Sequence, residues 1–68
     1  MGKLSVEIEI KPHHNYPETH SRVIVTTRNG FVFACDWAGK PELADAIQAW
    51  LDDRRSFRKY DTTNGEYL

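Results

Sequence analysis

The fold is decided by the stretch SRVIVTTRNGFVFACDW, residues 21–37. Two apolar runs, residues 22–28 and residues 31–37, flank the dipeptide Asn29-Gly30. Asn-Gly favours a type I′ turn, because both central residues of that turn need a positive φ and these residue types tolerate it. The pattern therefore predicts a β-hairpin whose strands are joined by a two-residue loop.

The register of this hairpin decides which side chains share a face. A two-residue loop pairs Arg28 with Phe31 and, further along, Val23 with Asp36. Side chains alternate across the pleat, so they divide into two sets. One face carries Val23, Val25, Thr27, Val32 and Ala34, and the other carries Ile24, Thr26, Phe31, Phe33, Cys35 and Trp37. Neither set is polar, whereas a solvated hairpin has one polar face, so both faces are expected to be covered.

Length and composition predict one small domain. The chain has 68 residues, with nine basic and ten acidic side chains and a net charge of −1. A domain of this size buries only about 60% of its unfolded surface, so its stability margin is thin. The near-neutral charge argues against a strongly electrostatic nucleic-acid binder. The single cysteine, and the lack of a membrane-length apolar run or signal-peptide core, predict a cytoplasmic protein.

The rest of the chain divides into four segments. Strict alternation over residues 3–11 predicts a half-buried strand, and residues 12–20, with two prolines and three histidines, predict a loop. A helix is expected over residues 41–56, because Pro41 suits a first helical turn. The tail, residues 60–68, is expected either to dock as a short strand or to fray, and it is a poor second cover for the hairpin.

One stripe of the predicted helix is apolar. Its members at helical spacing are Leu43, Ile47, Trp50, Leu51 and Phe57, with Ala46 beside them. Each element must bury its apolar side, so the predicted fold is α+β. It consists of a three-stranded antiparallel β-meander followed by one α-helix packed on one face, in the order βββα.

No catalytic or metal-binding pattern stands out. The possible metal ligands are His13, His14, His20 and Cys35, but their spacing matches no standard zinc site. We interpret the histidines as solvated loop residues and Cys35 as an inert packing residue in mid-strand. Asp36 is expected to cap the following turn or to pair with Arg22 or Lys40. We therefore expect no enzyme activity, no cofactor and no metal.

A basic cluster follows the predicted helix and consists of Arg54, Arg55, Arg58 and Lys59. One interpretation is contact with nucleic-acid phosphates. The other is a solvated helix end whose cations pair with Asp52, Asp53 and Asp61.

A second candidate surface mixes cations with aromatic rings. Arg22 and Arg28 accompany Phe31, Phe33 and Trp37 along the hairpin. Such a mixture can form a stacking platform for bases. Alternatively, the aromatic residues are the core beneath the helix, since exposing three of them would reduce solubility.

The aromatic-rich hairpin followed by the helical segment ADAIQAWL resembles the AP2-like, integrase arm-type DNA-binding domains over residues 21–51. The resemblance implies a sheet that enters the major groove with a helix packed behind it. Glu7, Glu9 and the absence of net positive charge depart from that pattern. No residue roles are carried over to this chain.

The leading hypothesis is a small non-enzymatic protein-binding module, acting as an inhibitor or adaptor of the kind common in phages and mobile elements. Its expected partner-binding residues are Phe31, Phe33, Trp37, Arg22 and Arg28. Self-association into a homodimer is the simplest way to cover the spare hairpin face. The alternative is a nucleic-acid-binding domain that uses the sheet and the basic cluster.

Overall fold

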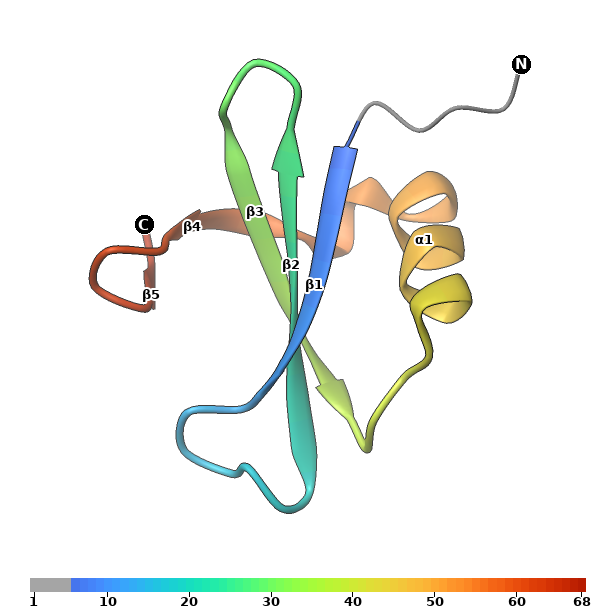
Figure 1. Cartoon of the computed structure of the whole chain (residues 1–68), viewed down its shortest axis with the longest axis vertical. Helices are drawn as coiled ribbons and strands as arrows, with labels where there is room; N and C mark the ends of the chain where they lie inside the picture. Colours follow the sequence, from blue (N-terminus) through green and yellow to red (C-terminus); the bar gives the residue numbers. More distant parts are fainter. Residues whose placement is uncertain (1–5) are drawn as a thin grey trace.

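The computed structural model describes residues 6–68 and shows a five-stranded antiparallel sheet with one α-helix (Figure 1). The elements are β1 (Val6–Pro12), β2 (His20–Thr27), β3 (Val32–Ala38), α1 (Leu43–Asp52), the 3₁₀ helix η1 (Arg54–Ser56), β4 (Arg58–Asp61) and β5 (Glu66–Tyr67). The strand order is β1-β2-β3-β4-β5. The predicted α+β class is confirmed, but the three-stranded βββα arrangement omitted two strands.

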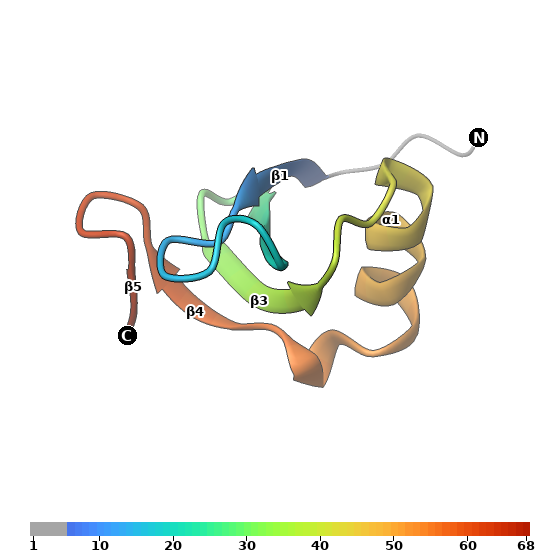
Figure 2. The same cartoon turned by 90° about the horizontal axis from the view of Figure 1, so that it is seen from below.

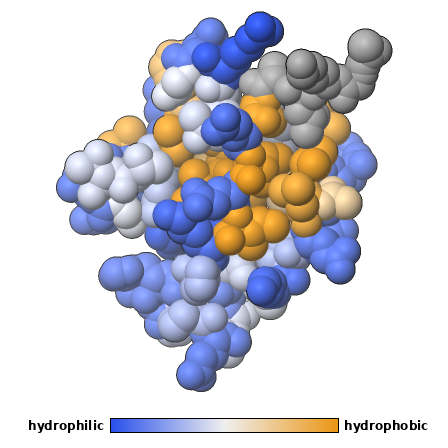
Figure 3. Space-filling view, in the orientation of Figure 1, coloured by the Kyte–Doolittle hydropathy of each residue, from blue (hydrophilic) through white to orange (hydrophobic). Residues whose placement is uncertain are grey.

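β1 forms one edge of the sheet and pairs with β2 from Val6↔Thr27 to Pro12↔Ser21. Its burial alternates as the sequence predicted, with Val6, Ile8 and Ile10 half-buried against the core. The part of the expected strand at residues 3–5 lies outside the described residues. Figure 3 shows apolar surface gathered around β1 and the side of α1 that faces it. Among residues 6–68, no helix has the length and apolar character needed to cross a membrane.

The hairpin between β2 and β3 forms, but its loop has three residues rather than two. The amide of Thr27 donates to the carbonyl of Phe31 at 2.8 Å, and the amide of Gly30 donates to the carbonyl of Thr27 at 2.9 Å. Gly30 has φ 90°, whereas Asn29 is not among the positive-φ residues. A three-residue loop that ends in a left-handed glycine is the next most common hairpin connection after the two-residue turns. The predicted register is therefore wrong by one residue.

The one-residue shift changes which side chains lie together. Val25 faces Phe33 and Val23 faces Cys35, so the β2 valines share a face with the β3 aromatic residues. This mixed face packs beneath the helix in a cluster that contains Val23, Val25, Ala46, Trp50 and Phe57, with Phe33, Cys35 and Trp37 against it. The predicted division of the side chains between the two faces is thus incorrect. A register shift of one residue moves the side chains of one strand to the opposite face relative to those of its partner.

The second face of the hairpin is covered by the end of the same chain. Ile24, Ala34 and Tyr60 form a second buried cluster, against which Tyr67 packs. Figure 2 shows α1 at one side of β1 and β3, and β4 leading past β3 to β5 at the opposite side. Tyrosine rings bury large areas, so two of them suffice to cover this narrow face. The expectations that residues 60–68 make a poor cover, and that another chain must bury this face, are wrong.

Helix α1 is shorter than the predicted residues 41–56. Its first turn is closed by a capping box in which the Asp45 carboxylate accepts the Glu42 amide at 3.3 Å. Ala46 and Trp50 form the buried line of the helix, and Leu51 is 55% exposed. Successive helical residues turn by about 100°, so Leu51 points away from the sheet that Trp50 contacts. The prediction that Leu43 and Leu51 belong to the core is wrong, since Leu43 is 54% exposed.

Candidate binding surface

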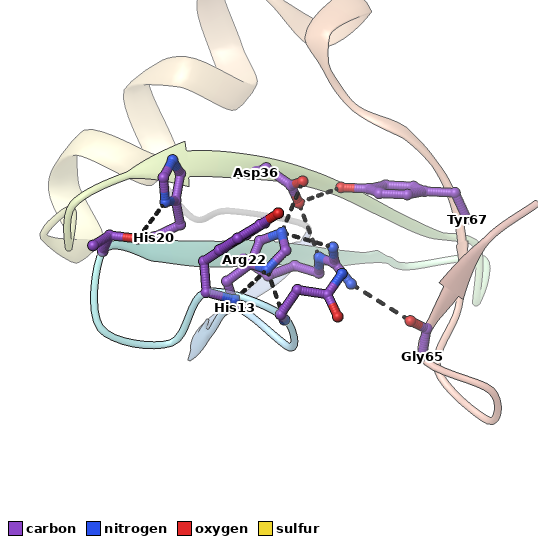
Figure 4. A network of polar contacts seen from close by, with 9 residues as sticks. His13, His20, Arg22, Asp36, Gly65 and Tyr67 are labelled. Carbon is purple, nitrogen blue, oxygen red and sulfur yellow. Dashed lines mark hydrogen bonds and ion pairs between the residues drawn. The ribbon is translucent and has the colours of Figure 1, made fainter.

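A polar cluster of His13, Arg22, Asp36 and Tyr67 joins the loop after β1, the hairpin and β5 (Figure 4). The Arg22 Nε donates to Asp36 Oδ1 at 2.9 Å, and the Tyr67 hydroxyl donates to the same oxygen at 2.8 Å. The second carboxylate oxygen lies 3.0 Å from His13 Nε2. Asp36 is therefore the common acceptor of three side chains from three parts of the chain.

His13 holds the 12–20 loop against the sheet. Its Nδ1 accepts the backbone amides of Asn15 at 3.0 Å and Tyr16 at 3.2 Å. Because Nδ1 accepts two amides, we assign the ring proton to Nε2, which then donates to Asp36 and lies 3.2 Å from the Arg22 Nη2 without accepting from it. His13 is only 6% exposed, so its interpretation as a solvated loop residue is wrong, whereas His14 is exposed as predicted. Within residues 6–68, no three metal-binding side chains gather into one group.

The charges of the polar cluster are stabilised internally. Burial alone would raise the pKa of Asp36, but the hydrogen bonds from Arg22, Tyr67 and His13 outweigh it and lower that pKa to about 2. Burial and the Asp36 charge raise the pKa of Tyr67. The Arg22 guanidinium lies 5.5 Å from the Tyr60 ring and 5.0 Å from the Tyr67 ring. This cluster fastens the C-terminal segment to the sheet, and its polar groups are already paired with one another.

Cys35 packs against the helix-side core, as predicted from its mid-strand position. Burial raises the pKa of its thiol to about 11, with a further contribution from the Asp36 charge. The thiol is therefore protonated at neutral pH and is a weak nucleophile.

A different surface lies between the hairpin and the junction of α1 with η1. Thr27, Phe33, Trp50, Arg54 and Arg55 line an open groove of about 330 Å³, which we call the arginine groove. The rings of Phe33 and Trp50 are 5.6 Å apart, and the Arg54 guanidinium lies 4.8 Å from the Trp50 ring. The floor of this groove is thus aromatic and its border is cationic.

The arginine groove continues into a neighbouring hollow of about 240 Å³. This hollow shares Thr27, Trp50 and Arg54 and adds Val6, Arg28, Asn29 and Leu51. Phe31, which is bonded through its backbone to Thr27, is 58% exposed. The exposed side chain of Leu51 therefore lines the hollow next to the groove, whereas Phe31 lines neither of the two.

The predicted basic cluster is divided by the fold. Arg54 and Arg55 line the arginine groove, and Lys59 pairs with Phe33 across β3 and β4, which places it on the same face. The Arg58 guanidinium instead lies 5.0 Å from the Tyr67 ring, on the covered second face. The expected pairing of these cations with Asp52, Asp53 and Asp61 is not found among the ion pairs of residues 6–68.

The other predicted surface residues also separate. Arg22 belongs to the polar cluster and is 9% exposed, so it cannot form part of an open platform with Phe31. Trp37 is half-buried beside the helix-side core. Of the predicted partner-binding set, Phe33 lines the arginine groove and Arg28 lines the neighbouring hollow, whereas Phe31 lines neither. Sequence reasoning missed Trp50 as a groove residue; its four-residue spacing from Arg54 was the available signal.

Comparison with protein-family models finds no match. Comparisons with curated proteins and with solved structures also find no significant match. The resemblance to AP2-like DNA-binding domains gains no support from these comparisons, and the two strands that follow α1 are absent from the element order on which it was based.

Proposed function

We propose that this chain is a small non-enzymatic protein-binding module. It binds its partner protein through the arginine groove and, by occupying the partner's surface, acts as an inhibitor or adaptor in the cytoplasm. The observation that carries this proposal is the lining that the groove shares with a neighbouring hollow, to which the exposed side chain of Leu51 also belongs. Single exposed apolar residues are common, but apolar side chains grouped around a hollow are typical of interaction sites.

The composition of the surface also supports a protein partner. Aromatic residues and arginine are enriched in the centres of protein interfaces, where they contribute much of the binding energy. The Arg54 guanidinium is held against the Trp50 ring, so Arg54 needs little further ordering on binding. A lower ordering cost leaves more of the contact energy available as affinity.

Nucleic-acid binding through Arg54, Arg55 and Lys59 remains the second candidate. A base-stacking site needs open ring faces. Trp50 is 4% exposed and its ring contacts Phe33, Phe57 and Arg54, so it offers no open face to a base. The observations therefore favour a protein partner over a strand of bases.

The proposal is tested by capture from a lysate of the native cells with the tagged chain. The groove variant combines Arg54→Glu with Arg55→Glu, and the matched control combines Lys11→Glu with Lys40→Glu, two exposed positions outside the groove. We expect a protein that is captured by the parent and the control, withstands nuclease treatment and is lost with the groove variant. Capture that disappears with nuclease would favour the nucleic-acid candidate instead.

A further inference from the structure

The floor of the arginine groove is rigid and apolar. The Trp50 ring packs at 88° against Phe57, with centroids 5.1 Å apart, and is tilted against Phe33. These contacts belong to the helix-side core, so the floor is held in place before anything binds. With a volume of about 330 Å³ and an open side, the groove suits one or two apolar side chains rather than an enclosed small molecule.

The border of the groove carries cations whose charges are not compensated locally. Arg54 and Arg55 in the groove, and Arg28 in the neighbouring hollow, are exposed and take part in none of the ion pairs among residues 6–68. The nearest carboxylates along the chain are engaged elsewhere. Asp53 accepts the Ser56 hydroxyl at 2.6 Å, and Asp52 accepts the Gln48 amide at 2.9 Å. Arginine presents a planar fork of donors that matches a carboxylate.

We propose that the arginine groove takes an acidic segment of a partner protein, with one large apolar side chain seated against the half-buried Phe33, beside the Trp50 ring, and carboxylates on Arg54 and Arg55. This inference rests on the proposed function and specifies the chemistry of the partner. Charge complementarity selects the acidic character, and the apolar floor selects the anchoring side chain. A neutral apolar segment would leave the arginines unpaired, and a purely acidic one would leave the floor unfilled.

A second copy of the chain is a weaker occupant. Leu43, which is exposed and flanked by Glu42 and Asp45, is an acidic apolar feature of this chain itself. It lies at the start of α1, whereas the groove lies at the end of α1. Contact between two such different surfaces would be head-to-tail, and it would not close into a symmetric dimer without a suitable rotation.

The two tryptophans provide an internal control for the test. Trp50 lies in the groove and Trp37 does not, so their indole N–H signals in ¹⁵N NMR report on the groove and on the rest of the fold. The probe is a twelve-residue peptide of Glu and Asp with one Phe and one Leu in the middle. Its controls are the same peptide with both anchors replaced by Ser, the same peptide with Gln for each acid, and a twelve-nucleotide oligo-dT.

We expect the anchored acidic peptide to shift the Trp50 signal saturably and to leave the Trp37 signal in place. Arg55→Glu should weaken this binding by about fivefold, as expected for the loss of an exposed ion pair, and Lys40→Glu should not weaken it. An unchanged Trp37 signal in Arg55→Glu establishes that the variant is folded.

Four results would overturn the inference. The peptide without anchors, or the Gln peptide, could bind as tightly as the anchored acidic peptide. Oligo-dT could bind more tightly than that peptide. The Trp50 signal could also shift with protein concentration alone, which would indicate self-association. Absence of binding by every probe would overturn it as well. In that case the proposed function would still be supported if the parent captured a protein from lysate, the capture resisted nuclease and it was lost in the groove variant. Failure of the inference can therefore be distinguished from failure of the proposed function.

Discussion

Arg22 and Asp36 lie directly opposite each other in the β2–β3 register and form an ion pair with 2.9 Å between Nε and Oδ1. In the register predicted from a two-residue loop, Asp36 would face Val23 and would lie on the other side of the sheet from Arg22. The pair therefore depends on the three-residue loop around Gly30. The polar cluster is built around this pair, and the Tyr67 hydroxyl of β5 donates to the same carboxylate.

Removal of the Asp36 carboxylate should destabilise the fold. Asp36→Ala leaves the buried Arg22 guanidinium and the Tyr67 hydroxyl without their shared acceptor, and we expect a loss of about 2 kcal/mol in the free energy of unfolding. A fully buried pair would lose about 3–5 kcal/mol, but the Asp36 side chain is 44% exposed. Urea unfolding measures the change, with Glu7→Ala as an exposed control. Equal stability of the two variants would contradict the role of Asp36.

The Asp36 carboxylate should also make the free energy of unfolding decrease at acidic pH. Its pKa in the folded protein is about 2, below the ordinary 3.8. The stabilisation is therefore present above about pH 4 and is lost as the pH falls toward 2. The difference in unfolding free energy between the parent and Asp36→Asn should narrow over that interval in a urea series. A difference that stays constant down to pH 2 would show that the carboxylate charge is not stabilised in this way.

Tyr67 should fasten the C-terminal segment over the second face. Tyr67→Phe removes one hydrogen bond and should cost about 1 kcal/mol. Tyr67→Ala also removes the ring from Arg22 and from the Ile24 cluster, and should cost about 2–3 kcal/mol. We expect Tyr67→Ala, but not Tyr67→Phe, to bind the dye ANS, which reports exposed apolar surface. A thermal melt of Tyr67→Ala identical to that of the parent would mean that β5 does not cover this face.

Two residues of the three-residue hairpin loop, Asn29 and Gly30, should respond differently to substitution. Gly30 has φ 90° and no neighbour within 4 Å of an added Cβ, so Gly30→Ala should cost about 1 kcal/mol through its backbone alone. Asn29 has no positive φ, so Asn29→Ala should change stability by less than about 0.5 kcal/mol. A type I′ turn would penalise both variants. Thermal unfolding of the two variants therefore distinguishes the loop types.

Cys35 should react slowly with alkylating agents. A thiol pKa of about 11, compared with the ordinary 9.0, lowers the thiolate fraction at pH 8 by about a hundredfold. Iodoacetamide modification followed by mass spectrometry should be slow in the folded protein and rapid in urea. Equal rates under the two conditions would show that the thiol is neither buried nor perturbed by Asp36.

The local pattern of the sequence determined several elements. Alternation identified β1, the apolar runs around Asn29-Gly30 identified the hairpin, and Pro41 with the following acidic residues marked the approach to α1. These features depend on side chains within a few residues of one another, where backbone preferences and periodicity act directly. Such reasoning also located the groove residues Arg54, Arg55 and Phe33, although not Trp50 beside them.

Only the tertiary structure decided the β2–β3 register, which segment packs on the second face of the hairpin and which residues line the arginine groove. Asn29-Gly30 is compatible with loops of two or three residues, and the choice between them turns one strand over relative to the other. The choice is made by contacts distant in sequence: Trp50 and Phe57 on one face, and Tyr60, Tyr67 and the Arg22–Asp36 pair on the other. The free energy of burying those rings depends on where the whole chain brings them, and no local pattern contains that information.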